Sequence, residues 1–132
     1  GDAARRAWAG VLLDALDDPV GADADERRLA AATAFIQRNL ARRLDRRTVA
    51  AAAGQSVDAL GRLFRRRAGC GVGAWIASAR LEVAADRLRR TERPVTEIAL
   101  DCGFSEHSAL SRAFRRRYGM TPRAWRRAHR VK

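Results

Sequence analysis

The feature that most restricts the fold of this 132-residue chain is an internal repeat. The segment ALGRLFRRRAG, residues 59–69, returns as ALSRAFRRRYG, residues 109–119, and the two differ at only three of the eleven positions. The repeat extends upstream, because TVAAAAGQS (48–56) corresponds to EIALDCGFS (97–105), after which the second copy contains one additional residue. A solenoid needs at least about three stacked units to bury a continuous core. We therefore expect two related structural units in one chain.

Each copy has the pattern of a helix-turn-helix, in which a short helix, a glycine turn and a longer helix follow one another. No run of β-branched residues alternates with period two, so the chain is predicted to be all-α. Gly54 and Gly103 mark the turns, and Asp45, Ser56 and Ser105 are predicted N-caps. The expected helices are 3–16, 25–41, 46–53, 57–68, 74–90, 95–101, 106–118 and a last one opened by Thr121-Pro122.

The longer helix of each copy has an apolar face and a polar face. The inward residues recur with helical spacing, and they are Leu60, Leu63 and Phe64 in the first copy and Leu110, Ala113, Phe114 and Tyr118 in the second. The outward stripes are Asp58, Gly61, Arg62 and Arg65 in the first and Ser108, Ser111, Arg112 and Arg115 in the second. Small or polar residues followed by Arg suit the reading of base edges in a major groove.

Charge points to a polyanionic partner. The net charge of the chain is +12 at pH 7, and residues 31–132 alone carry twenty-three Arg or Lys against eight acids. Such a density favours nucleic acid or an acidic membrane surface. A membrane is disfavoured because no helix combines a basic face with a large aromatic apolar face, and no apolar run reaches the ~20 residues that span a bilayer. With no signal peptide in the sequence, we expect a cytoplasmic, nucleoid-associated protein.

Three segments resemble the DNA-binding domain of the AraC/XylS family of bacterial transcriptional regulators. They are VTEIALDCGFSEHSALSRAFRRRYGMTPRAWR (95–126), ARLEVAADRL (79–88) and SVDALGRLFRRRAG (56–69). The resemblance implies about seven helices in two helix-turn-helix subdomains joined by a long helix. It also implies binding to an asymmetric promoter site through two adjacent major grooves, and activation through contact with RNA polymerase. No cofactor or metal is implied.

The resemblance also assigns residues to the contacts with DNA. The expected base-reading residues are Asp58, Gly61 and Arg62 in the first unit and His107, Ser108, Ser111 and Arg112 in the second. Helix N-termini and flanking arginines are expected to contact phosphates, through Arg46, Ser56, Arg65, Arg66, Thr96, Arg115 and Arg116. The two units are not equivalent, because Gly61 has no side chain and Asp58 can pair with Arg62 or repel phosphate. We expect the second unit to dominate specificity and the first mainly to add phosphate affinity.

The expected organisation follows the helices and the charge. It comprises an N-terminal helix with an acidic linker (1–26), a first subdomain (27–72), a linker helix (73–91) and a second subdomain (92–132). The linker helix, about 25 Å long at 1.5 Å per residue, is expected to bring the recognition helices toward ~34 Å apart, one turn of B-DNA.

The N-terminal part of the chain leaves alternatives open. The short stretch ahead of the module suggests a fragment of a longer protein whose missing N-terminal domain would bind a small-molecule effector or dimerise. The helix over 3–16 is then either the tail of that domain, an interdomain or dimerisation helix, or a helix that packs on the first subdomain.

Three other functions compete with this interpretation. An enzyme is disfavoured because His107 and His129 lack a partnered Cys or acid at nucleophile-like spacing and no phosphate-binding glycine loop is present. A DNA-repair methyl-acceptor would need an activated thiol, whereas Cys70 and Cys102 have no evident activating neighbours. A non-specific nucleic-acid binder would leave two capped, repeated helices unexplained. It would also lose affinity equally on all sequences as salt rises.

Overall fold

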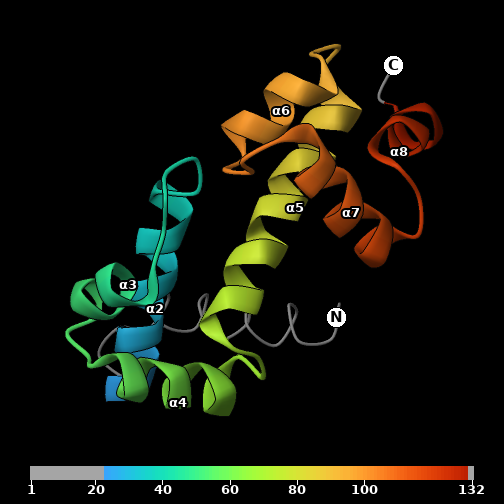
Figure 1. The fold of residues 1–132 in the computed structure, drawn as a ribbon. Coiled ribbons are helices and arrows are strands. Elements are labelled where there is room, and N and C mark those ends of the chain that lie inside the picture. Colours follow the sequence, from blue (N-terminus) through green and yellow to red (C-terminus); the bar gives the residue numbers. More distant parts are fainter. Residues whose placement is uncertain (1–22, 131–132) are drawn as a thin grey trace. The chain divides into compact units, whose positions relative to one another are not determined.

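A computed structural model describes residues 23–130 of the chain, and these residues form seven helices and no strand (Figure 1). The all-α prediction is confirmed, while the helix predicted over 3–16 lies outside the described residues. The helices are α2 (Ala24–Arg38), α3 (Arg46–Ala52), α4 (Val57–Arg67), α5 (Val72–Arg90), α6 (Val95–Asp101), α7 (His107–Tyr118) and α8 (Pro122–His129). The predicted order is therefore correct, and the predicted helix ends either coincide with the observed ones or differ by up to three residues.

The helices belong to two compact units. The first unit contains residues 23–39 and Leu44–Ile76, so it holds α2, α3, α4 and the start of α5. The second unit contains Leu40–Arg43 and the chain from Ala77 onward, which includes the rest of α5 and α6, α7 and α8. Helix α5 thus contributes to both units, and Leu40–Arg43 belongs with the second unit although only Asn39 separates it from α2.

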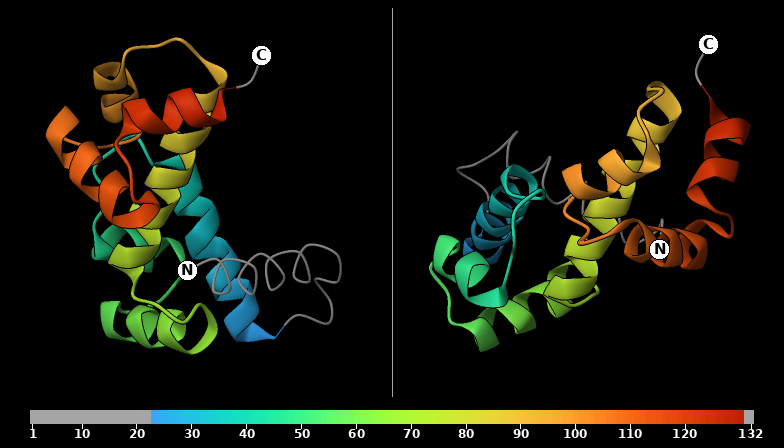
Figure 2. Two further views of the ribbon diagram at one scale, coloured as in Figure 1. Left: turned by 90° about the vertical axis from the view of Figure 1, so that its right-hand side faces the viewer. Right: turned by 45° about the horizontal axis from the view of Figure 1, so that its top comes forward.

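In the first unit, polar side chains fix the starts of three helices. The carboxylate of Asp45 accepts a hydrogen bond from the Thr48 amide at 2.9 Å, and the Ser56 hydroxyl accepts one from the Ala59 amide at 3.2 Å. Both predicted N-caps are confirmed, and Asp23 caps α2 in the same way. Helices α2, α3 and α4 lie together in all views of Figures 1 and 2. The side chains that fill this core include Leu29, Ile36, Val49, Leu60, Leu63, Phe64 and Trp75.

The second unit repeats this arrangement around its own core. Helix α7 packs on α6 and α8. The buried cluster comprises Leu81, Ala84, Ala85, Leu88, Val95, Ile98, Ala99, Cys102, Leu110 and Phe114. Helix α8 starts as predicted, since the Thr121 hydroxyl accepts from the Ala124 amide at 3.2 Å and Pro122 occupies the first turn. In each unit the short helix therefore packs against the longer one, α3 against α4 and α6 against α7.

The prediction that Ser105 caps α7 is wrong. The N-cap is Glu106, and its side chain makes no capping hydrogen bond. It instead accepts a hydrogen bond from the Ser108 hydroxyl at 2.6 Å. The additional residue of the second copy explains the difference: it lengthens the turn after Gly103, so the N-cap stands fifty residues after Ser56 rather than forty-nine.

An aromatic cluster and the Arg126 guanidinium hold α8 against the rest of the second unit. The Trp125 ring centroid lies 5.7 Å from that of Phe114 and 4.7 Å from that of Tyr118. The Trp125 indole also donates to the Ala85 carbonyl at 3.2 Å. The Arg126 Nε donates to the Leu88 carbonyl at 3.0 Å, near the end of α5. Buried Trp N–H groups need such an acceptor, and a cation suits the C-terminal end of a helix.

Candidate nucleic-acid interface

Helix α4 presents the predicted polar stripe on its outer face. Its inward residues Leu60, Leu63 and Phe64 are at most 1% exposed, which confirms the orientation of the helix. Asp58, Arg62 and Arg65 are exposed, and Gly61 is partly exposed between them. The predicted phosphate residues Arg46, Ser56 and Arg66 are exposed as well.

Helix α7 has the same division. Leu110 and Phe114 are fully buried, Ala113 and Tyr118 are partly buried, and all four are on the inward side as predicted. The predicted base-reading residues are exposed or, for Ser111, partly exposed: His107, Ser108, Ser111 and Arg112. The predicted phosphate residues Thr96, Arg115 and Arg116 are also exposed. The structure therefore makes every one of these side chains available, while their roles as DNA contacts stay predictions.

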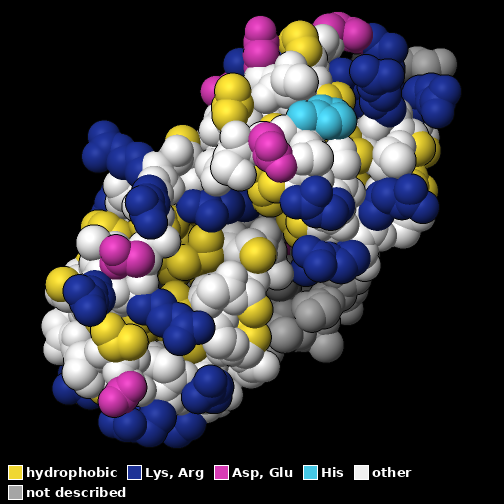
Figure 3. Space-filling model, in the orientation of Figure 1, with side chains coloured by type: hydrophobic (Ala, Val, Ile, Leu, Met, Phe, Trp, Pro, Cys, Tyr) yellow, Lys and Arg dark blue, Asp and Glu magenta, His cyan; other side chains and the backbone are white. Residues whose placement is uncertain are grey.

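Most arginines of the two outer faces have no protein partner within residues 23–130. No hydrogen bond or ion pair joins Arg62, Arg65, Arg112, Arg115 or Arg116 to another residue of this part of the chain. Arg66 and Arg67 differ, because carboxylates at the start of α2 bind them. In Figure 3 the visible face carries many Arg side chains and few acidic ones. Such a face attracts the phosphates of a nucleic acid.

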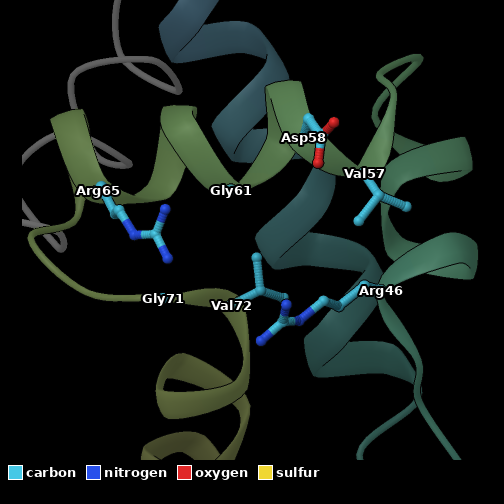
Figure 4. Close-up of a pocket in the computed structure, with 7 residues that line it drawn as sticks. All are labelled: Arg46, Val57, Asp58, Gly61, Arg65, Gly71 and Val72. Atoms are coloured by element: carbon cyan, nitrogen blue, oxygen red, sulfur yellow. The ribbon is translucent and has the colours of Figure 1, made fainter.

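A hollow of about 180 Å³ opens beside the outer face of α4. Figure 4 shows the guanidinium groups of Arg46 and Arg65 pointing into it from α3 and α4. Its remaining lining residues are Val57, Asp58, Gly61, Gly71 and Val72. Because Gly61 contributes no side chain, the polar stripe of α4 is interrupted at its centre.

Alanine in place of Gly61 is expected to raise the free energy of unfolding by about 0.5–1 kcal/mol, since Gly is that much less favourable than Ala inside a helix. A Cβ at this position would meet nothing within 4 Å, and the backbone there does not have positive φ. Urea denaturation of the whole chain measures the change. A loss of stability would contradict the prediction, because it would mean that the hollow is closed by a contact absent from the structure.

Two arginines that matter for the second unit were missed in the sequence. The Arg80 Nε donates to the Leu40 carbonyl at 3.2 Å, and its Nη2 donates to the Arg42 carbonyl at 3.1 Å. The Arg117 Nη1 donates to the Ser78 hydroxyl at 3.2 Å, which ties α7 to α5. Backbone carbonyl acceptors have no signature in a sequence, so no motif could have indicated the first of these contacts.

The thiols do not have the environment of a methyl acceptor. Cys102 is buried in the core of the second unit and Cys70 is partly buried. Burial raises the pKa of both thiols above the usual value, which disfavours the nucleophilic thiolate. Within residues 23–130 no three His, Cys, Asp or Glu side chains group as metal ligands, and no helix has the length and apolarity of a membrane span.

Comparison with known proteins identifies relatives of this chain. A helix-turn-helix domain family matches residues 49–128. Regulatory protein SoxS of Escherichia coli K12 is 38% identical over 93 residues, which cover 70% of this chain and 87% of SoxS. Right origin-binding protein of the same organism is 40% identical over 80 residues, which cover 61% of this chain but only 28% of that protein.

Solved structures with a similar fold include DNA-binding domains of transcriptional regulators. An AraC-type DNA-binding domain protein from Chromobacterium violaceum matches with a TM-score of 0.74 and 28% identity over 77% of this chain and 91% of that chain. The DNA-binding domain of the transcriptional factor AdpA, solved with a target DNA, matches with a TM-score of 0.72 and 33% identity, covering 75% of this chain and 89% of that chain. The two-unit arrangement of helices is therefore that of known DNA-binding domains.

Proposed function

This chain belongs to the AraC/XylS family of transcriptional regulators, and from that premise we propose that it binds double-stranded DNA sequence-specifically through α4 and α7. The observation that carries the proposal is the repeated unit, in which a short helix packs against a longer helix whose outer face is polar and rich in Arg that has no ion-pair partner within residues 23–130. One helix of this width fits one major groove, and two such helices in one chain suit an asymmetric site with two boxes.

The side chains divide into two roles. Arg112 is proposed to read a guanine edge, with His107, Ser108 and Ser111 beside it, because guanidinium and hydroxyl donors suit base edges. Arg115, Arg116 and Thr96 are proposed to contact phosphates around that groove. In the first unit Arg62 and Asp58 flank Gly61, so fewer side chains are available to read bases, and Arg46, Ser56 and Arg65 are proposed to bind phosphate. Helix α5, which contributes to both units, is proposed to act as the linker.

The regulatory output is also a proposal. The chain spans 28% of the length of the Right origin-binding protein and 87% of that of SoxS, so the relatives differ in what surrounds the DNA-binding part. We propose that the protein works in the bacterial cytoplasm, activates transcription by contacting RNA polymerase, and responds to a small-molecule effector only through a further N-terminal domain. It is not proposed to catalyse a reaction.

Selection from a randomised duplex pool at roughly physiological salt tests the proposal, because a specific binder enriches sites far above its non-specific affinity. We expect two conserved boxes centred about 10 bp apart. A single box would limit base reading to one unit. Binding without enrichment would refute sequence-specific recognition and leave only the attraction between the positive charge and phosphate.

A further inference from the structure

The two Arg-Arg-Arg runs of the repeat are identical in sequence but not in surroundings. Arg66 and Arg67, in the last turn of α4, bind carboxylates at the start of α2. Arg116, fifty residues after Arg66, makes no hydrogen bond or ion pair in the described part of the chain. Arg117 bonds a neutral hydroxyl, that of Ser78. Two arginines of the first run are thus paired with acids of the first unit, whereas no acid within residues 23–130 pairs with the second run.

The carboxylates come from three residues at the N-terminal end of α2, which we call the acidic turn: Asp23, Asp25 and Glu26. The Arg66 Nη2 lies 2.8 Å from the Asp25 Oδ2, and the Arg67 Nη2 lies 2.5 Å from the Asp23 Oδ2. The Arg67 guanidinium also lies 3.7 Å from Asp25 and 4.0 Å from Glu26. These contacts join residues more than forty positions apart, so only the fold brings them together.

The acidic turn is charged and its contacts can be exchanged. The hydrogen bond from Arg66 holds the pKa of the Asp25 carboxyl below its usual value, so that carboxylate is ionised at neutral pH. The Arg66 side chain remains 54% exposed, which leaves it open to an approaching anion. Exposed ion pairs contribute only about 0–1 kcal/mol. A phosphate offers a guanidinium the same oxygen geometry as a carboxylate.

We propose that the acidic turn is an internal substitute for DNA phosphate, which occupies Arg66 and Arg67 and so weakens the hold of the first unit on DNA. The inference rests on the proposed function, and it adds an autoinhibitory contact to that function. It gives a second reason, besides Gly61, why the first unit contributes less than the second. It also makes the acidic turn a point of regulation, because anything that draws these acids away releases two guanidinium groups for DNA.

The first test compares equivalent arginines, using the whole chain and a random-sequence duplex of about 30 bp as probe. Each phosphate contact contributes about 0.9 to the slope of log affinity against log salt. Arg116→Gln is therefore expected to reduce the slope by about 0.9, and Arg66→Gln to change it little, because Asp25 already occupies that side chain. Equal reductions by both substitutions would overturn the proposal.

The second test removes the competing carboxylate. Asp25→Asn is expected to steepen the slope by up to about 0.9, which corresponds to as much as an eightfold gain in affinity at about 0.1 M salt. Asp86→Asn is the control, since Asp86 also binds two arginines, Arg89 and Arg90, at 3.0 and 2.8 Å. The double variant Asp25→Asn/Arg66→Gln should lose the gain.

The outcomes separate this inference from the proposed function. A gain shared by Asp86→Asn, or retained in the double variant, would show that net charge alone explains the effect and would overturn the competition. If the wild-type chain binds no duplex at any salt concentration, both the proposed function and the inference are refuted. If the wild-type chain binds the duplex and the variants have the same affinity and salt slope as the wild type, only the inference is refuted.

Discussion

Alanine in place of Gly103 is expected to lower the free energy of unfolding by roughly 2–4 kcal/mol, a large part of the stability of a small domain. Gly103 forms the turn of the second helix-turn-helix and has a φ of +92°. An L-residue in left-handed backbone costs about 1–2 kcal/mol. A Cβ there would also lie 2.1 Å from the Leu40 carbonyl oxygen and 2.7 Å from the Arg80 Nε.

The contact with Leu40 cannot relax easily. Arg80 donates to the carbonyls of Leu40 and Arg42, so this segment is held in place by the guanidinium that the new methyl group would approach. Either the carbonyl moves and these hydrogen bonds weaken, or the turn opens and shifts the start of α7. Forcing one additional carbon into such a site costs about 1–3 kcal/mol beyond the backbone strain.

Gly54 provides the matched control for this prediction. It forms the corresponding turn of the first unit with a φ of +65°, but a Cβ there would meet nothing within 4 Å. Gly54→Ala should therefore cost only about 1 kcal/mol, from strain partly offset by the lower entropy of the unfolded chain. Urea denaturation followed by circular dichroism measures both variants. Equal losses in the free energy of unfolding would show that the close approach of Gly103 to Leu40 adds nothing to the cost of the substitution.

Local chemistry made most of the fold predictable from the sequence. The caps at Asp45, Ser56 and Thr121 were predictable because an N-cap depends on one side chain and amides two or three residues away. The outer faces of α4 and α7 followed from helical periodicity alone. Ser105 was wrongly predicted because the additional residue could be absorbed on either side of it, and the sequence pattern does not decide between the two.

Contacts between distant segments were not predictable in the same way. Arg80 and Arg126 donate to carbonyl oxygens some forty residues away, and every residue has such an oxygen. The pairing of Arg66 with Asp25 combines two charged residues of common types, and only the packing of α2 on α4 brings them within 2.8 Å. The sequence therefore indicated which arginines face outward but not which of them are already occupied.

Arg112→Ala is expected to relax base preference in one box of the DNA site, with a loss of discrimination of about 1–3 kcal/mol, the usual contribution of a bidentate Arg–guanine contact. Arg112 is exposed on the outer face of α7, and no hydrogen bond or ion pair within residues 23–130 holds it. Partly exposed Ser111 precedes it and exposed Ser108 lies one turn earlier on the same helix. We therefore expect α7 to be the main reader of sequence.

Arg62 is the equivalent residue of α4, and Arg62→Ala is expected to weaken binding on all sequences while it reduces the salt slope by about one, as the loss of a phosphate contact does. Its neighbour Gly61 has no side chain, and Asp58 repels the phosphates that would hold α4 deep in a groove.

Repeating the duplex selection with both variants measures the preference at every position. If Arg62→Ala relaxes base preference as much as Arg112→Ala does, the two units share the reading and the asymmetry is refuted. If neither variant relaxes it while both reduce the salt slope, these arginines bind phosphate, and base recognition lies with His107, Ser108 and Ser111.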